Sequence, residues 1–220
     1  GGQYYPPGHP LYKKDTIEIR YMTAKDEDIL TSQTLLRKGL AIDRMLENLC
    51  VDQGVQVDDL LVGDKSALVL AARISGYGAD YQTKVTCPSC NKAEVTHFDL
   101  DEVQHDPGTV VSEGIEEVQA TPHGTFLVTL PKTEYEVEFR LLTGQDERYL
   151  IEAANKKTKL HLPDAAATEL LKRLIVSIND VTDHSEINGF VDNMPALDSR
   201  FLRACVQGAT PGVDMTQLYS

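Results

Sequence analysis

Cysteine is scarce in this sequence, and long apolar stretches are missing from it altogether. Four cysteines among 220 residues are too few for a disulfide framework in a chain of this length. No apolar run approaches the roughly 18 residues that a membrane-spanning helix needs, and the first residues have no signal-peptide pattern. The sequence therefore predicts a soluble protein without a membrane among its partners.

Basic residues are in the minority. Lysine and arginine number 21 against 34 aspartates and glutamates, which gives a formal net charge of -13. A surface of this charge repels a phosphate backbone, so we expect no nucleic-acid partner. The hydrophobic fraction of 41% and the charged fraction of 25% are those of an ordinary globular protein with one large domain or two small ones.

The common catalytic motifs are absent. The sequence contains no Gly-x-x-x-x-Gly-Lys phosphate loop, no His-Glu-x-x-His motif and no Gly-x-Ser-x-Gly elbow. Glu134, Glu136 and Glu138 line one face of a predicted strand, where we expect a solvated acidic surface rather than a catalytic acid and base. We therefore predict that the protein is not an enzyme.

Hydrophobic periodicity predicts an α+β fold, in which helical N-terminal and C-terminal units bracket a Cys-x-x-Cys zinc-knuckle hairpin and a second β-hairpin. No internal repeat is apparent beyond a loose recurrence of helices, hairpin and helices. We expect five segments: an extended N-terminal arm over 1–15, a strand plus helical unit over 16–80, the cysteine hairpin over 81–100, a linker and β-hairpin over 101–142, and a C-terminal helical unit over 143–220.

Within these segments, alternation predicts a strand over 16–21 with its isoleucines and Tyr21 buried. Helices are predicted from Thr23, over 40–50, and from Gly63 to 74, the last apolar almost all round and so centrally buried. The region 101–117 is predicted to be a loop, and 125–141 a half-buried hairpin. Four more helices are expected to begin near residues 143, 163, 183 and 195, the second with an apolar stripe through Ile178 and the last with Leu197 on its apolar side.

The strongest candidate site is the pair Cys87 and Cys90, between two strand-like runs. Two thiolates three positions apart fit one zinc ion, but a closed structural site needs four ligands. A redox dithiol is the second reading, because Cys-Pro-x-Cys resembles the glutaredoxin sequence, although that motif should open a helix. Unmetallated thiols at a turn are the third. His97 is expected to lie too far along its strand to be a ligand, and Cys50 and Cys205 are expected to be reduced core thiols.

Several stretches together resemble the baseplate hub and hub-assembly proteins of T-even-type and related contractile-tailed bacteriophages. The resemblance runs through most of the chain from about Thr16. It is carried by the stretches Met22 to Leu30, Leu61 to Lys65, Ala71 to Gly78, Cys87 to Cys90, Phe139 to Glu147, Leu174 to Asn179 and Asp198 to Arg203.

The resemblance implies a structural component of a tail baseplate, in the hub or wedge region, assembled in the host cytoplasm. Its partners would be other baseplate and tail-tube proteins, with multiple copies in a symmetric assembly. A transient hub-assembly chaperone is the alternative within the family, and a thiol oxidoreductase the one outside it. The family pattern continues past Thr216 into a second Cys-x-x-Cys, which would complete a Cys₄ zinc site with Cys87 and Cys90 if the given chain is trimmed.

Overall fold

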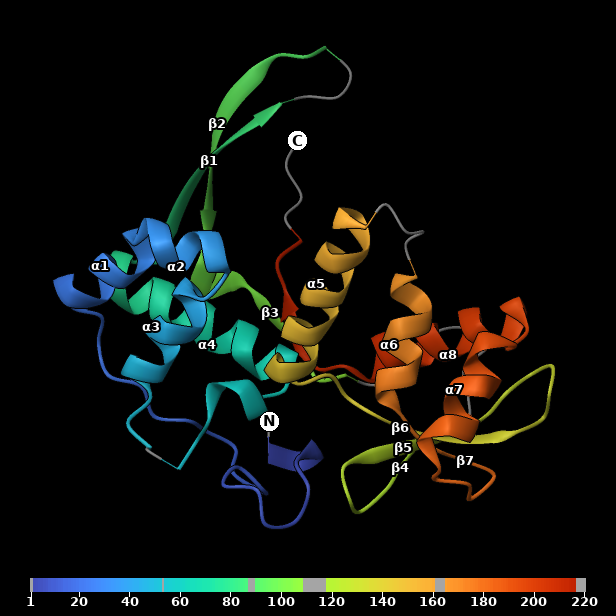
Figure 1. Ribbon diagram of the computed structural model, residues 1–220. Helices are drawn as coiled ribbons and strands as arrows, with labels where there is room; N and C mark the ends of the chain where they lie inside the picture. The colour runs from blue at the N-terminus through green and yellow to red at the C-terminus, as the bar shows by residue number, and fades with distance from the viewer. Residues whose placement is uncertain (1, 53, 87–89, 109–117, 161–164, 217–220) are drawn as a thin grey trace.

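The fold mixes helices with antiparallel sheet. The computed structural model describes residues 2–52, 54–86, 90–108, 118–160 and 165–216, and Figure 1 shows the arrangement. The helices are α1 (Ala24–Thr31), α2 (Gln33–Lys38), α3 (Ala41–Leu49), α4 (Val62–Tyr77), α5 (Gly144–Lys159), α6 (Ala166–Leu174), α7 (His184–Asp192) and α8 (Ala196–Ala209). The strands are β1 (Asp80–Thr86), β2 (Ala93–Asp99), β3 (Gln104–Asp106), β4 (Gln119–Ala120), β5 (Thr125–Thr129), β6 (Glu136–Arg140), β7 (Ile175–Ile178) and β8 (Gly212–Asp214).

The strands form three separate sheets, all antiparallel. The largest has the order β4-β5-β6-β7, and the other two are the pairs β1-β2 and β3-β8. In β6, Val137 and Phe139 are fully buried while Glu136 is exposed, so the alternation of the sequence marks the two faces of this strand. The α+β class and both predicted hairpins are confirmed.

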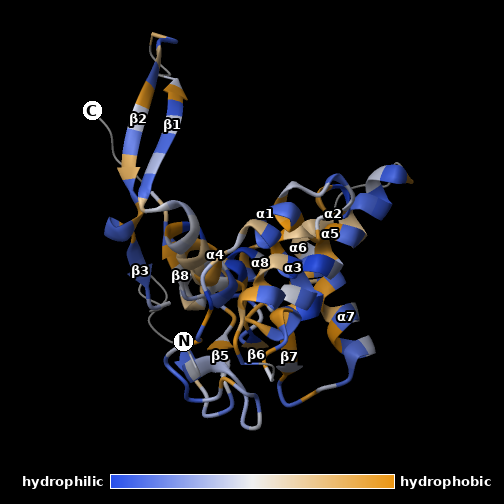
Figure 2. Cartoon of the chain, turned by 90° about the vertical axis from the view of Figure 1, so that its left-hand side faces the viewer, coloured by the Kyte–Doolittle hydropathy of each residue, from blue (hydrophilic) through white to orange (hydrophobic). Residues whose placement is uncertain are grey.

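One apolar core joins elements from the whole chain. It includes Leu46 and Leu49 of α3, Phe139 of β6, Leu171 of α6 and Leu202 of α8, each no more than 1% exposed. Each of these side chains contributes roughly 1.5–3 kcal/mol through burial. In Figure 2, orange apolar positions gather where the helices meet the sheet. Beyond residues 1–15, the predicted division of the chain into segments stays a prediction.

The sequence predicted an extended arm over residues 1–15, and this prediction is wrong: the segment packs against the rest of the chain. Tyr5 and Leu11 are each 2% exposed and belong to the core. The Tyr5 hydroxyl donates to Asp64 and accepts from the backbone N–H of Leu61, both residues lying at the start of α4. A buried tyrosine needs such partners, and here they tie the segment to its own chain.

The predicted strand over 16–21 is reduced to a single bridge between Ile19 and Cys50. Ile17 and Ile19 pack partly against the core, but Tyr21 is 79% exposed rather than buried. In α3, Ile42 also faces outward, with 40% of its surface exposed. The helix α4 is confirmed, yet only its Leu68 and Ala72 are fully buried, so the expected central burial is wrong.

Four of the described strands were not predicted: β3, β4, β7 and β8. The stripe predicted to run helically through Ile178 ends at Leu174, and β7 follows, because the β-branched residues of 175–178 pair with β6. Within the predicted loop 101–117, β3 pairs with the distant β8, a contact that local periodicity does not show. The expected helix start near Pro163 lies outside the described residues. In α8, Leu197 is 54% exposed and Asp198 is buried in its stead.

None of the helices in the described ranges combines the length and apolar character of a membrane span.

Candidate functional site

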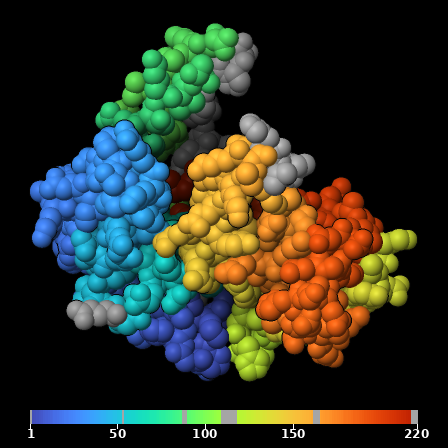
Figure 3. All heavy atoms as spheres, in the orientation of Figure 1, coloured from blue at the N-terminus to red at the C-terminus, as the bar shows by residue number. Residues whose placement is uncertain are grey.

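The cysteine hairpin stands away from the rest of the molecule. Its strands β1 and β2 pair in register from Asp80↔Asp99 to Thr86↔Ala93, and Figures 1 and 3 show them rising above the body in green. Val95 is 59% exposed, and the residues of both strands are exposed or half-buried. A two-stranded hairpin with both faces in solvent is only marginally stable by itself. This hairpin is therefore a part of the chain suited to gaining stability from something outside it.

Of the predicted metal ligands, Cys90 is exposed at the turn of the hairpin, and Cys87 lies outside the described residues. The chain after Cys90 enters strand β2 rather than a helix, so the described residues around Cys90 show no helix terminus that could activate a redox dithiol. In the described part of the chain, no three histidine, cysteine or carboxylate side chains come together as a metal site. The described residues thus supply one thiol of the expected zinc site.

His97 lies where the sequence placed it, on the exposed strand β2. Its Nδ1 is 3.1 Å from the Asp80 carboxylate, at the base of the hairpin and away from the turn. The side chain is exposed to solvent. Cys205 is fully buried in α8, and burial raises the pKa of its thiol to about 11. Cys50 is half-buried, and burial, together with the charge of Asp52, raises its pKa as well.

Helix α1 begins with an ion pair that also caps it. Arg20 donates from both terminal nitrogens to Asp26, at 2.8 Å each. The same carboxylate accepts from the backbone N–H and the hydroxyl of Thr23, closing a capping box. The hydrogen bonds from Arg20, aided by those of Thr23, outweigh burial and hold the pKa of Asp26 well below its usual range. We call these three residues the first Arg–Thr–Asp motif.

Helix α5 begins with the same arrangement, the second Arg–Thr–Asp motif. Arg140 binds both oxygens of Asp146, and Thr143 donates its N–H and hydroxyl to that carboxylate. Here Arg173 adds a further hydrogen bond to Asp146. Burial raises the pKa of Asp146, but the bonds from Arg140, Thr143 and Arg173 outweigh it and leave the pKa well below its usual range.

The two motifs are parts of a larger repeat. Ile19, just before the first motif, pairs with Cys50 directly after α3, and Phe139, just before the second, pairs with Ile175 directly after α6. Arg20 also donates to the carbonyl of Asn48, as Arg140 does to that of Arg173, in each case two residues before the paired strand residue. We name residues 2–78 the first unit and residues 118–209 the second unit.

Sequence analysis missed this repeat. The signal was available in the common pattern Arg-x-x-Thr-x-x-Asp-Glu, preceded in both units by Glu and an apolar residue. Outside this stretch the units differ in loop length and in their strands, which hides the similarity from periodicity alone. The prediction that the chain has no internal repeat beyond a loose recurrence of elements is therefore wrong.

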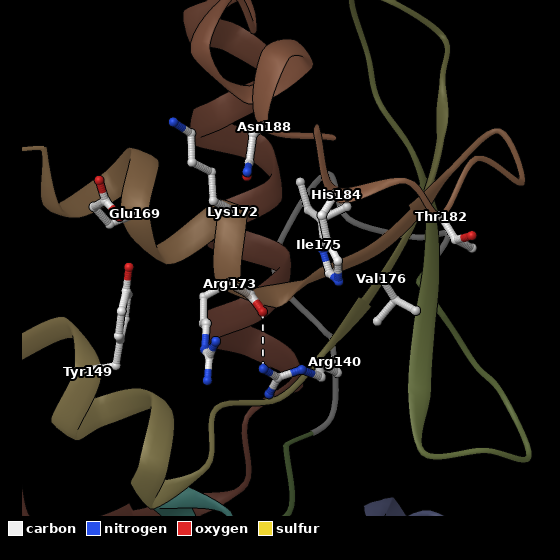
Figure 4. Close-up of a pocket in the computed structure, with 10 residues that line it drawn as sticks. All are labelled: Arg140, Tyr149, Glu169, Lys172, Arg173, Ile175, Val176, Thr182, His184 and Asn188. Carbon is white, nitrogen blue, oxygen red and sulfur yellow. Dashed lines mark hydrogen bonds between the residues drawn. The ribbon is translucent and has the colours of Figure 1, made fainter. Parts of the chain in front are cut away.

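An open cavity of about 920 Å³ lies beside the second motif (Figure 4). Arg140 and Arg173 lie side by side on one wall, with Arg140 bonded to the Arg173 carbonyl, while His184 and Asn188 lie across from them. The basic groups are already engaged: the two arginines with Asp146, and Lys172 with Asp192 at 2.6 Å. The cavity is thus bordered by ion pairs that support the helices around it.

A second ion-pair cluster joins the two units. Lys65 of α4 lies 2.7 Å from Asp43 of α3 and 3.0 Å from Glu147 of α5. Arg148, also on α5, donates to Asp43 at 2.9 Å and to Asp58. Burial alone raises the pKa of Asp43, but the hydrogen bonds from Lys65 and Arg148 outweigh it and lower the pKa.

The ion pairs described above hold helices in place, and the cysteine hairpin presents exposed strands to the surroundings. A family model described as T4 bacteriophage base plate protein matches residues 9–121, just over half of the chain. The chain belongs to this family. Neither the comparison with curated proteins nor that with solved structures gave a match.

The matched region covers the first unit except its first residues, the whole cysteine hairpin, and the chain up to the start of the large sheet. Family membership confirms the resemblance seen in the sequence. It indicates a structural role in a phage baseplate, contacts with other baseplate proteins, and a place in the virion tail.

Proposed function

We propose that the protein is a permanent structural component of a contractile-tail baseplate, in the hub or wedge region, and that it acts through protein–protein contacts. The observation that carries the proposal is the family match, because it includes the projecting hairpin together with the unit from which the hairpin emerges. The net charge of -13 favours partners with basic surfaces, since opposite charge steers and selects association.

Purified tails test this proposal. Cryo-electron microscopy should show density for the chain in the hub or wedge region, and quantitative mass spectrometry should find it at a fixed, symmetric copy number in mature particles. A chain present in assembly intermediates but missing from finished tails would instead be a transient hub-assembly chaperone. The tail-tube proteins serve as the internal standard for copy number.

We further propose that Cys87 and Cys90 bind zinc together with ligands from another part of the polypeptide or of the assembly. The supporting observations are the position of Cys90 at the hairpin turn and the exposure of both strands. A metal would stabilise a hairpin that packing does not.

Metal analysis of the purified protein tests the zinc proposal. We expect about one zinc per chain, lost in Cys90→Ser and retained in Cys205→Ser, because the buried thiol of α8 is far from the hairpin in the fold. Wild-type protein that is free of zinc after purification without chelators would refute the proposal. An insulin-reduction assay on the same samples addresses the oxidoreductase alternative, for which we expect no activity above background.

A further inference from the structure

The two units differ at one strand position. In the second unit β6 has a strand on each edge, whereas in the first unit the corresponding segment around Ile19 is bridged on one edge only within the described residues. In the first unit, Arg20 donates its N–H to the carbonyl of Leu49 at 2.9 Å, and Val51 donates to that of Glu18 at 3.1 Å. Successive residues of an extended chain direct their backbone groups to opposite edges. The N–H and C=O groups of Ile17 and Ile19 therefore point to the other edge, which we call the open edge.

No hydrogen bond to the open edge is found within the described residues. The side chains of Ile17 and Ile19 pack partly on the core, whereas Glu18 and Tyr21 are exposed. The backbone of residues 17–20 is thus held by hydrogen bonds along one edge and by the packing of Ile17 and Ile19 on the core. An unpaired edge of this kind is a template for another strand.

In the second unit, β5 occupies the corresponding edge. Phe126 pairs with Phe139, the counterpart of Ile19, and Val128 pairs with Val137, the counterpart of Ile17. Phe126 and Val128 are 2% and 3% exposed, and the Phe126 and Phe139 rings stack with centroids 5.4 Å apart. The chain itself therefore shows what fits this edge: an antiparallel strand of about five residues with apolar side chains at alternate positions.

The first unit also has room for those side chains. A groove of about 390 Å³ runs beside Ile17, and Ala67, Leu68 and Ala71 of α4 line it. Helix α4 corresponds to α8, since each follows the paired strand residue in sequence and packs on the helix that precedes that residue, α3 in the first unit and α6 in the second. Counting from the buried residues Leu68 and Leu202, Ala71 takes the position of Cys205, which is fully buried in α8, yet Ala71 is exposed.

Resting on the proposed baseplate role, we propose that the open edge and this groove bind an extended segment of another baseplate protein. The segment adds as an antiparallel strand beside residues 16–20, and its alternate apolar side chains enter the groove against Ala67, Leu68 and Ala71. Main-chain hydrogen bonds provide the pairing, and the groove selects for apolar residues at every second position.

A peptide copy of the chain's own β5 tests the site in the isolated protein. The probe has the sequence of residues 124–130, with lysines added at its ends for solubility, and the control peptide has serine in place of Phe126 and Val128. We expect the probe, but not the control, to slow amide exchange at Ile17 and Ile19 by about tenfold or more, which corresponds to roughly 1.4 kcal/mol of protection. The Arg20 amide, already bonded to Leu49, should change little.

A matched pair of variants locates the binding. Ala71→Arg fills the groove and should abolish the effect of the probe, whereas Ser66→Arg, at an exposed position of α4 away from the groove, should leave it intact. Equal far-ultraviolet spectra and unfolding midpoints show that both variants fold. Probe binding that survives Ala71→Arg, or exchange that the probe does not alter, would overturn the proposal.

The assembled tail gives the second arm. Hydrogen–deuterium exchange of the 16–22 fragment should be slower in purified tails than in the isolated chain. A chain that is present in tails with an unprotected fragment would refute the docking site while leaving the baseplate role standing, and absence from tails would refute the role itself. Concentration-dependent dimerisation abolished by Ala71→Arg would identify a second copy as the occupant and overturn the assignment to another protein.

Discussion

A single carboxylate caps the first α-helix of each unit. Asp146 is 1% exposed and accepts hydrogen bonds from two arginines and a threonine. These protein donors take the place of the water molecules that would otherwise solvate the charged carboxylate. Such a group stabilises the fold only while all its partners remain. Asp26 has the same position in the first unit, with one arginine fewer.

Asp146→Asn should therefore lower the free energy of unfolding by about 3 kcal/mol, because the substitution leaves Arg140 and Arg173 without their counter-charge. Chemical denaturation measured by circular dichroism gives this value. The control is Asp192→Asn, which removes the pair with Lys172 at a carboxylate that is 53% exposed and should cost less than about 1 kcal/mol. Equal losses in the two variants would contradict the special role of Asp146.

The same carboxylates predict a dependence on pH. The pKa values of Asp26 and Asp146 are lower in the folded state than the roughly 3.9 of an unfolded chain. Their contribution is therefore complete above about pH 5 and is lost as the pH falls below about 4 toward the folded-state values. Denaturation between pH 6 and pH 3 should show a steeper loss of stability in the wild type than in Asp146→Asn. Parallel curves would count against this assignment.

The thiols should differ in reactivity. Cys90 is exposed, whereas Cys205 is fully buried with a raised pKa, and the thiolate is the reactive form. In metal-free native protein at pH 8, iodoacetamide should modify Cys90 long before Cys205, as peptide mass spectrometry would show. Unfolding in urea should abolish the difference. Early labelling of Cys205 in native protein would contradict the packing of α8.

At the scale of elements, the close approach of α4 and β8 depends on one glycine. A β-carbon on Gly63 would lie 1.8 Å from the carbonyl oxygen of Pro211, too near for any side chain. Gly63→Ala should cost at least about 2 kcal/mol, because either the helix or the strand must move. Gly189→Ala, in α7, meets no atom within 4 Å and should gain up to about 1 kcal/mol. Thermal unfolding of both variants checks the contrast.

Elements with strong local signals were predictable from sequence, and elements defined by distant partners were not. The helix starts near Thr23, Thr143 and Asp183 and the alternation in β6 are local, and the structure confirms them. The strand β7 is different: its apolar pattern fits a helix or a strand, and only pairing with β6 decides. The same holds for β3, whose partner lies beyond the second unit.

The candidate site shows the same division. The hairpin follows from local pattern and is confirmed. The open edge could not be predicted, because it depends on comparing two units whose likeness lies in three-dimensional pairing. The burial of Tyr5 could not be predicted either. The segment around Tyr5 is rich in glycine and proline and gives no periodic signal, yet residues distant in sequence bury the Tyr5 side chain.

At the scale of the molecule, the ion-pair cluster around Asp43 links the two units. Asp43→Asn should weaken its bonds to Lys65 and Arg148, and we expect a loss of about 2–3 kcal/mol in unfolding free energy. Arg44, on the same helix, pairs with Glu47 at the surface and provides the control, Arg44→Ala, with an expected loss under about 1 kcal/mol. Differential scanning calorimetry would measure both, and a negligible effect of Asp43→Asn would show that the core alone joins the units.

The pairing of β3 with β8 bears on the order in which the molecule assembles during synthesis. In the sequence, β3 precedes the second unit and β8 follows it. In space, β3 pairs with β8, and β8 also packs against α4 of the first unit. Closing so long a loop is slow, because its entropy must be lost before the contact forms. The sheet and helices of the second unit are close together in sequence, so this unit can fold before the β3–β8 pair forms. We therefore expect the N-terminal half, although synthesised first, to reach its final packing last.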